Sequence, residues 1–119
     1  MEITSLDGPS CFLDVLGDTP KNRVLDFLLG EMGYDFTLKE IAEKSGVGYA
    51  SVRRMWPRIV ASKVVKPTRR VGKAVFYEYD LSTKEGRALR NFYLEVLFKE
   101  AEKELKKQRL RLPPLSSKN

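Results

Sequence analysis

The sequence predicts a mainly α-helical fold with one small β-hairpin, an α+β arrangement of 119 residues that ends in a long helix. Helix-start signals precede several segments in which apolar residues recur every three or four positions, which places them on one helical face. Two short runs rich in Val, Phe and Tyr flank a glycine and predict the hairpin. The last periodic segment, roughly residues 84–110, predicts the C-terminal helix.

Two helices are predicted before the middle of the chain. Ser10 is a suitable N-cap for a short helix that Gly17 ends. Thr19 followed by Pro20 is typical of a helix start, because proline at the first helical position loses no hydrogen bond. We expect this second helix to span residues 20–31.

Two further helices, joined by a short turn, predict a helix-turn-helix. Thr37 and Glu40 have the capping-box spacing that starts a helix, and Gly46 suits the left-handed conformation that ends one. The next helix begins near Tyr49. Its apolar stripe, which we expect to face the core, consists of Val52, Met55, Trp56, Ile59 and Val60.

The hairpin follows directly and predicts a winged helix-turn-helix. The first run begins at Val64-Val65 and the second covers residues 74–79. We expect a tight basic loop over residues 69–73, in which Gly72 supplies a positive φ angle. Pro67 confines the first strand to a sheet edge.

Composition excludes several classes of function. The chain has no histidine and a single cysteine, Cys11, so it predicts no zinc site, no histidine relay and no disulfide framework. It has no glycine-rich phosphate loop, and we expect neither catalysis nor a bound cofactor or metal. No apolar run reaches membrane-spanning length and the first residues lack a secretory pattern, so we expect a cytoplasmic protein without membrane contact.

The positive charge is concentrated in one block. The net charge is +6, yet residues 45–77 contain eight of the 22 basic residues and no Asp or Glu. The rest of the chain contains the other 14 basic residues and all 16 acidic residues, so it is nearly neutral. A cationic block over a helix-turn-helix and its hairpin predicts binding to double-stranded DNA. A basic face that is merely solvated is the alternative.

Helical geometry selects the candidate DNA contacts. The helix after the turn fits the major groove, where arginine binds guanine edges, although Pro57 predicts either a bend or an early helix end. Its candidate residues are Tyr49, Ala50, Ser51, Arg53, Arg54 and Arg58, with Arg53 and Arg54 expected to contact bases. The wing candidates for the backbone or minor groove are Lys66, Arg69, Arg70 and Lys73, and Thr37 and Lys39 are candidates for positioning contacts.

The C-terminal helix has an apolar face beyond the main core. We expect it to pair two copies of the chain, since two-fold pairing suits palindromic sites. The alternative is packing against the helix at 20–31 and the N-terminal segment. The predicted dimer residues are Leu89, Phe92, Tyr93, Val96, Leu97 and Leu105. The predicted parts are an N-terminal segment with a short helix (1–18), the winged helix-turn-helix (19–81), the dimerisation helix (82–112) and a flexible tail (113–119).

Three stretches resemble ArsR/MarR-type winged-helix regulators, especially the small ones common in archaea. Residues 12–25 look like their entry helices, residues 38–54 resemble their helix-turn-helix, and residues 64–77 look like their wing. The resemblance implies a homodimeric transcriptional regulator. The chain lacks the cysteine and histidine ligands of metal-sensing ArsR members, so metal sensing is not implied, and no small-molecule effector is identified.

The predicted function is that of a sequence-specific regulator, acting as a repressor by occupying its site. Two alternatives remain open at this point. One is a DNA-binding replication, partition or chromatin factor of plasmid or virus type. The other is a protein-interaction adaptor in which the apolar C-terminal helix is the active surface, because winged helices also bind proteins.

Overall fold

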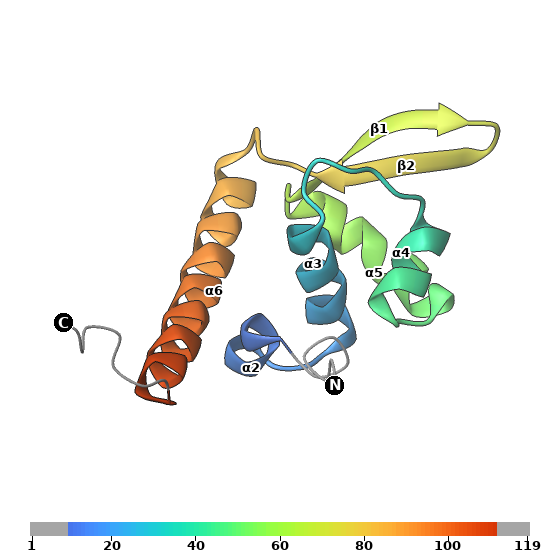
Figure 1. Cartoon of the computed structure of the whole chain (residues 1–119). Coiled ribbons are helices and arrows are strands. Elements are labelled where there is room, and N and C mark those ends of the chain that lie inside the picture. Colours follow the sequence, from blue (N-terminus) through green and yellow to red (C-terminus); the bar gives the residue numbers. More distant parts are fainter. Residues whose placement is uncertain (1–9, 112–119) are drawn as a thin grey trace.

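The structure, a computed structural model, describes residues 10–111. Residues 1–9, residue 112 of the predicted dimerisation helix and the predicted tail lie outside the described residues. Figure 1 shows a helical body from which the hairpin and the last helix extend in different directions. In chain order the elements are α2 (Cys11–Leu16), α3 (Pro20–Gly30), α4 (Leu38–Ser45), α5 (Tyr49–Ala61), β1 (Val65–Val71), β2 (Ala74–Tyr79) and α6 (Lys84–Arg111).

The predicted helix starts are confirmed by side-chain caps. The Ser10 hydroxyl accepts a hydrogen bond from the Leu13 amide at 3.2 Å, and the Thr19 hydroxyl accepts one from the Asn22 amide at 3.1 Å. Thr37 and Glu40 form the complete capping box. Each cap satisfies a backbone amide that the first turn of a helix leaves without a partner, so the sequence sets where α2, α3 and α4 begin.

The core lies where α3, α4 and α5 meet. Val24, Ile41 and Val52, one from each helix, are completely buried. Gly46 ends α4 in the left-handed conformation, with a φ angle of 74°, as predicted. Of the apolar stripe on α5, the structure buries Val52, Trp56 and Ile59.

The expectation that Val60 faces the core is wrong, because its side chain is 39% exposed. Met55 is half-buried. At about 100° per residue, Met55 and Val60 lie at the two edges of the stripe, roughly 70° from its centre. The three central side chains are enough to fill the contact with α3 and α4.

The hairpin is longer and its turn shorter than predicted. Val65 pairs with Tyr79 at the base and Val71 pairs with Ala74 at the tip, so the turn contains only Gly72 and Lys73. Gly72 has the expected positive φ angle, 61°. The predicted loop over 69–73 is therefore wrong, since residues 69–71 belong to β1. The register shifts between Pro67 and Arg69, which leaves Thr68 as a bulge that interrupts the side-chain alternation of a regular strand.

A short β-bridge attaches the hairpin to the helical body. Phe36, in the connection between α3 and α4, exchanges two backbone hydrogen bonds of 2.8 Å with Tyr77 of β2. Aromatic contacts surround this bridge: the Phe36 ring lies 5.0 Å from that of Phe27, and the Tyr77 ring lies 5.1 Å from that of Trp56. The wing is thereby held against both α3 and α5.

The last helix packs against α2 through its first half. The Phe12 ring lies 6.2 Å from the Phe92 ring and 5.5 Å from the Tyr93 ring. Leu89 and Tyr93 pack against the core. The fold-back alternative thus holds for this part of the helix, and Leu89 and Tyr93 are not a free dimer surface. Beyond Val96, every residue from Leu97 to Leu110 is exposed.

Candidate nucleic-acid interface

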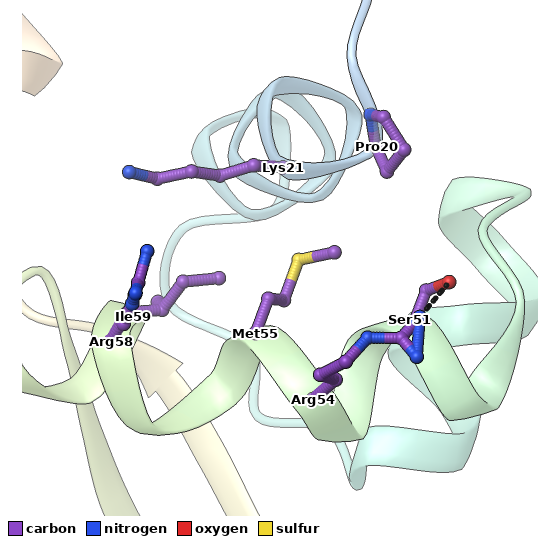
Figure 2. A pocket seen from close by; sticks show the side chains of 7 residues that line it. All are labelled: Pro20, Lys21, Ser51, Arg54, Met55, Arg58 and Ile59. Atoms are coloured by element: carbon purple, nitrogen blue, oxygen red, sulfur yellow. Dashed lines mark hydrogen bonds between the residues drawn. The ribbon is translucent and has the colours of Figure 1, made fainter.

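Two grooves flank the outer side of α5. The first lies between α3 and α5 and is drawn in Figure 2; its lining residues are Pro20, Lys21, Ser51, Arg54, Met55, Arg58 and Ile59. The second lies between α4, the start of α5 and the hairpin; its lining residues are Thr37, Leu38, Lys39, Tyr49, Lys73, Ala74, Val75 and Tyr77. Helix α5 is therefore a ridge with the first groove along its α3 side and the second groove beside its N-terminal end.

The ridge presents most of its predicted residues to solvent. Ala50, Arg53, Arg54 and Arg58 are exposed, Tyr49 is 47% exposed and Ser51 is half-buried. Helix α5 continues past Pro57 to Ala61, so of the two outcomes expected from this proline the early helix end is wrong. Proline lacks an amide hydrogen, so the Arg53 carbonyl loses its usual amide partner four residues later, and the proline ring also crowds that carbonyl.

Arg53 and Arg54 are neighbours in sequence but turn to different sides of the ridge. The Arg53 guanidinium lies 5.8 Å from the centre of the Tyr49 ring, on the side of the second groove. The Arg54 guanidinium donates a 3.3 Å hydrogen bond to the Ser51 hydroxyl, in the first groove. Together they offer two separate donor groups to a ligand that lies along α5.

The second groove brings together predicted residues from three elements. Lys39 of α4, Tyr49 of α5 and Lys73 of the hairpin turn all line it. Thr37 also lines it, but its hydroxyl accepts from the Glu40 amide and donates to the Glu40 carboxylate. The Thr37 side chain is thus already used as the cap of α4, and Lys39 is the charged group at this edge.

The four predicted wing cations fall into two groups. Arg69 donates hydrogen bonds of 2.9 and 3.2 Å to the Asp35 carboxylate, and its guanidinium lies 3.9 Å from the centre of the Phe76 ring. Lys66 lies 3.9 Å from the carboxylates of both Glu78 and Asp80. These two cations therefore have carboxylate partners within the chain, and Arg69, which we expected in a loop over residues 69–73, lies in β1.

Arg70 and Lys73 form the second group. Both are exposed, and neither takes part in an ion pair among residues 10–111. Arg70 pairs with Val75 near the end of the hairpin, and Lys73 lies in its turn. The positive charge that the wing offers to a ligand is therefore concentrated at its far end.

Asp35 and Lys21 were not predicted as part of this surface. Hydrogen bonds from Arg69 and then Thr68 lower the pKa of Asp35 from 3.8 to about 2, so the carboxylate stays ionised and holds the hairpin. Lys21 is brought to α5 by the packing of α3. A lone acid before Phe36 and a lysine after Pro20 carry no local pattern that indicates these tertiary contacts.

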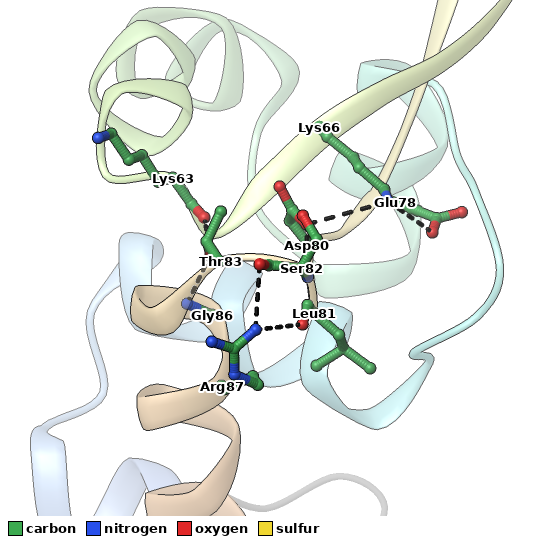
Figure 3. A network of polar contacts seen from close by, with 9 residues as sticks. All are labelled: Lys63, Lys66, Glu78, Asp80, Leu81, Ser82, Thr83, Gly86 and Arg87. Atoms are coloured by element: carbon green, nitrogen blue, oxygen red, sulfur yellow. Dashed lines mark hydrogen bonds and ion pairs between the residues drawn. The ribbon is translucent and has the colours of Figure 1, made fainter.

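A polar junction connects the end of α5, the end of β2 and the start of α6, as Figure 3 shows. The Asp80 amide donates to the Val64 carbonyl at 2.8 Å. The Asp80 carboxylate accepts from the amide and hydroxyl of Ser82, at 2.9 and 2.6 Å, and these bonds lower the pKa of Asp80. The Tyr79 hydroxyl donates to the Gly86 carbonyl at 2.8 Å, and burial raises the Tyr79 pKa to about 12. The last helix is thereby fixed to the hairpin.

Within residues 10–111, no three acidic or cysteine side chains gather in a way that could hold a metal ion. No helix of this part of the chain has the length and apolar character needed to cross a membrane.

Solved structures of transcriptional regulators share this architecture. A MarR family regulator from Silicibacter pomeroyi matches with a TM-score of 0.50 and 20% identity, over 82% of this chain and 63% of that chain. A mutant of MarR from E. coli matches with a TM-score of 0.55 and 19% identity, over 82% and 70% of the two chains. A double mutant of ZitR from Lactococcus lactis matches with a TM-score of 0.56 and 12% identity, over 85% and 75%.

These identities establish a common fold. The match covers less than two thirds of the S. pomeroyi chain, at 63%. In sequence comparisons, no family model and no curated protein matches the chain. The chain has the winged-helix fold of MarR-family regulators, mainly α-helical with a two-stranded antiparallel hairpin.

Proposed function

We propose that this chain is a sequence-specific, double-stranded DNA-binding transcriptional regulator that acts as a homodimer and represses by occupying its site. Helix α5 enters the major groove in this proposal. Arg70 and Lys73 contact the backbone or the adjacent minor groove. The observation that carries the proposal is the basic surface formed by α5, its two grooves and the hairpin end, since neither groove has an acidic lining residue.

The shape and charge of this surface suit duplex DNA. The major groove is about 12 Å wide and admits one α-helix. Ala50 is small and exposed, so the backbone of α5 can approach the bases closely there. Arg53 and Arg54 supply separate donor groups, and arginine can bond to O6 and N7 of guanine together. We assign these two residues to base contacts and Arg58 to the backbone.

The structural neighbours support a regulatory role. They are transcriptional regulators, and one of them is the antimony-specific transcriptional repressor AntR, with a TM-score of 0.51. A possible transcriptional regulator from Methanosarcina mazei matches over 83% of each chain with a TM-score of 0.50. The resemblance to ArsR regulators and to small archaeal regulators remains a proposal, as does the sign of regulation.

The exposed half of α6 supports a homodimer. Leu97, Phe98 and Leu105 are between 41% and 62% exposed and fall within about 100° of the helix circumference, so they form an apolar strip that the single chain leaves uncovered. Of the six predicted dimer residues, we now propose Leu97 and Leu105 as the pairing set, with Phe98 beside them. Val96 lies about 180° around the helix from Leu105 and lines a groove with Cys11 and Val15 of α2, and Phe92 contacts Phe12 of α2. Sedimentation should give a dimer for the full chain, and Leu105→Glu should shift it toward the monomer.

Sequence selectivity can be tested on a duplex selected from a random pool. The wild-type chain should bind the selected duplex more tightly than random duplex. Arg54→Ala should cost about 1–3 kcal/mol on the selected duplex and relax the preference at one base pair. Lys106→Ala, which replaces an exposed lysine on α6, is the matched control and should change neither the affinity nor the base preference. If wild type and Arg54→Ala show the same affinity and the same base preference at every position of the site, Arg54 does not contact a base.

A further inference from the structure

The first groove is lined by three cations that come from two helices. Lys21 lies in the first turn of α3, and Arg54 and Arg58 lie one turn apart on α5. None of the described residues that line the groove is acidic. No carboxylate in the groove offsets these three positive charges, and the charges repel each other. An anionic ligand would relieve this repulsion, so the groove favours one.

The groove has an apolar floor between its charged walls. Ile59 is buried and Met55 is half-buried. Figure 2 shows Met55 between the two helices, with Lys21 extending toward the Arg58 end and Arg54 at the Ser51 end. A DNA strand has matching features, since the sugar is largely apolar and the phosphate is charged. A sugar over Met55 would place its phosphate at the Lys21–Arg58 end.

The groove also lies on the side of α5 away from the wing. At about 100° per residue, Arg58 is roughly 180° around the helix axis from Tyr49, which lines the groove on the hairpin side. A helix in the major groove has one phosphate strand on each side of it. Lys39 and Lys73 serve one side, and the other side needs its own cations.

We infer that the groove between α3 and α5 binds one phosphate of the DNA backbone, and that Lys21 is a backbone contact on the strand away from the wing. The inference rests on the proposed function and deepens it by assigning a residue outside the helix-turn-helix and wing. Arg58 shares this phosphate, and Arg54 remains available to the bases.

The salt dependence of binding to a random-sequence duplex tests the inference, because phosphate contacts supply nearly all of such binding. We compare the full-length wild-type chain with Lys21→Ala, Lys21→Arg and the control Lys106→Ala by fluorescence anisotropy. Lys21→Ala should weaken binding on the order of tenfold and reduce the slope of log K against log salt by about 0.9. Lys21→Arg should restore both values, and Lys106→Ala should leave both unchanged.

Ethylation interference on a selected duplex locates the contact. Lys21→Ala should lose interference at a phosphate on the strand away from the wing and keep it at the phosphate that Arg70→Ala loses. If Lys21→Ala keeps the wild-type affinity and slope while Arg70→Ala weakens binding, the groove is not a phosphate site and the proposed function stands. If the wild-type chain binds no duplex, both the inference and the proposed function are overturned. Circular dichroism of each variant confirms that it is folded.

Discussion

The hydroxyl of Thr83 donates a 2.7 Å hydrogen bond to the carbonyl of Lys63. Lys63 follows α5 in the left-handed conformation, with a φ angle of 68°. The same hydroxyl accepts a 2.9 Å bond from the Gly86 amide at the start of α6. One side chain therefore links the end of the proposed recognition helix to the start of the proposed dimerisation helix. In a dimer, this link would set how the two α5 helices are placed on DNA.

Thr83→Ala should destabilise the fold by about 1–3.5 kcal/mol, the sum expected from a lost N-cap and a lost hydrogen bond. Thr83→Ser keeps the hydroxyl, and serine is also a good N-cap, so its free energy of unfolding should stay within about 0.3 kcal/mol of wild type. Urea unfolding at neutral pH measures both. Equal stability of the alanine and serine variants would show that the hydroxyl contributes nothing.

Gly86→Ala should destabilise the fold, because a methyl group there would collide with the backbone carbonyl of Asp80. Overpacking against a backbone atom costs about 1–3 kcal/mol. Gly30→Ala is the matched control, since its methyl would make an ordinary 3.5 Å contact with the Tyr93 hydroxyl. That change should be neutral or stabilising by up to about 1 kcal/mol. A Gly86→Ala protein as stable as wild type would contradict the close approach of α6 to Asp80.

The Asp35–Arg69 pair should make the free energy of unfolding depend on pH under acidic conditions. Folding lowers the Asp35 pKa from 3.8 to about 2. The stabilisation from the pair is therefore complete above pH 3.8 and is lost as the pH falls through about 2. Asp35→Asn should have a lower urea midpoint than wild type at neutral pH, and the difference should shrink across this window. Asp14→Asn, at an exposed site without an ion pair among the described residues, serves as the control. A difference that does not change with pH would contradict the pair.

The wing cations should differ in their effect on DNA binding. Arg70→Ala should weaken binding to all sequences and lower the salt slope by about 0.9, the value for one lost phosphate contact. Lys66→Ala should leave the slope unchanged, because the Lys66 ammonium lies near the carboxylates of Glu78 and Asp80. Anisotropy titrations over a salt series measure both. Equal losses of slope in the two variants would contradict the division of the wing into two groups.

The elements of the fold were predictable where the signal is local. The caps at Ser10, Thr19 and Thr37 join groups only three residues apart, and Gly46 ends its own helix. Such contacts depend on nearby residue types alone, so the helix starts could be predicted from the sequence. The hairpin was less predictable because the bulge at Thr68 breaks the alternation that indicates a strand.

The tertiary contacts were not predictable from local patterns. Arg69 and Asp35 are 34 residues apart. No local sequence pattern distinguishes Arg69, which forms this pair, from its neighbour Arg70, which does not. The apolar side chains of α6 show that the helix needs a partner but not which one. The structure packs Leu89 and Tyr93 against the core and leaves Leu97 exposed. Only the packing of α3 against α5 reveals Lys21 as part of the basic surface.

Selective DNA binding is tested by titrating the wild-type chain with a duplex from its own upstream region and with a random duplex. Salt near about 50 and about 200 mM separates selective binding from purely electrostatic binding. A tight complex with the upstream duplex should persist at the higher salt while the complex with the random duplex is lost. Binding that ignores sequence and collapses with salt would instead favour a replication, partition or chromatin factor. No binding at either salt would contradict a DNA-binding function and leave the exposed face of α6, with a protein partner, as the active surface.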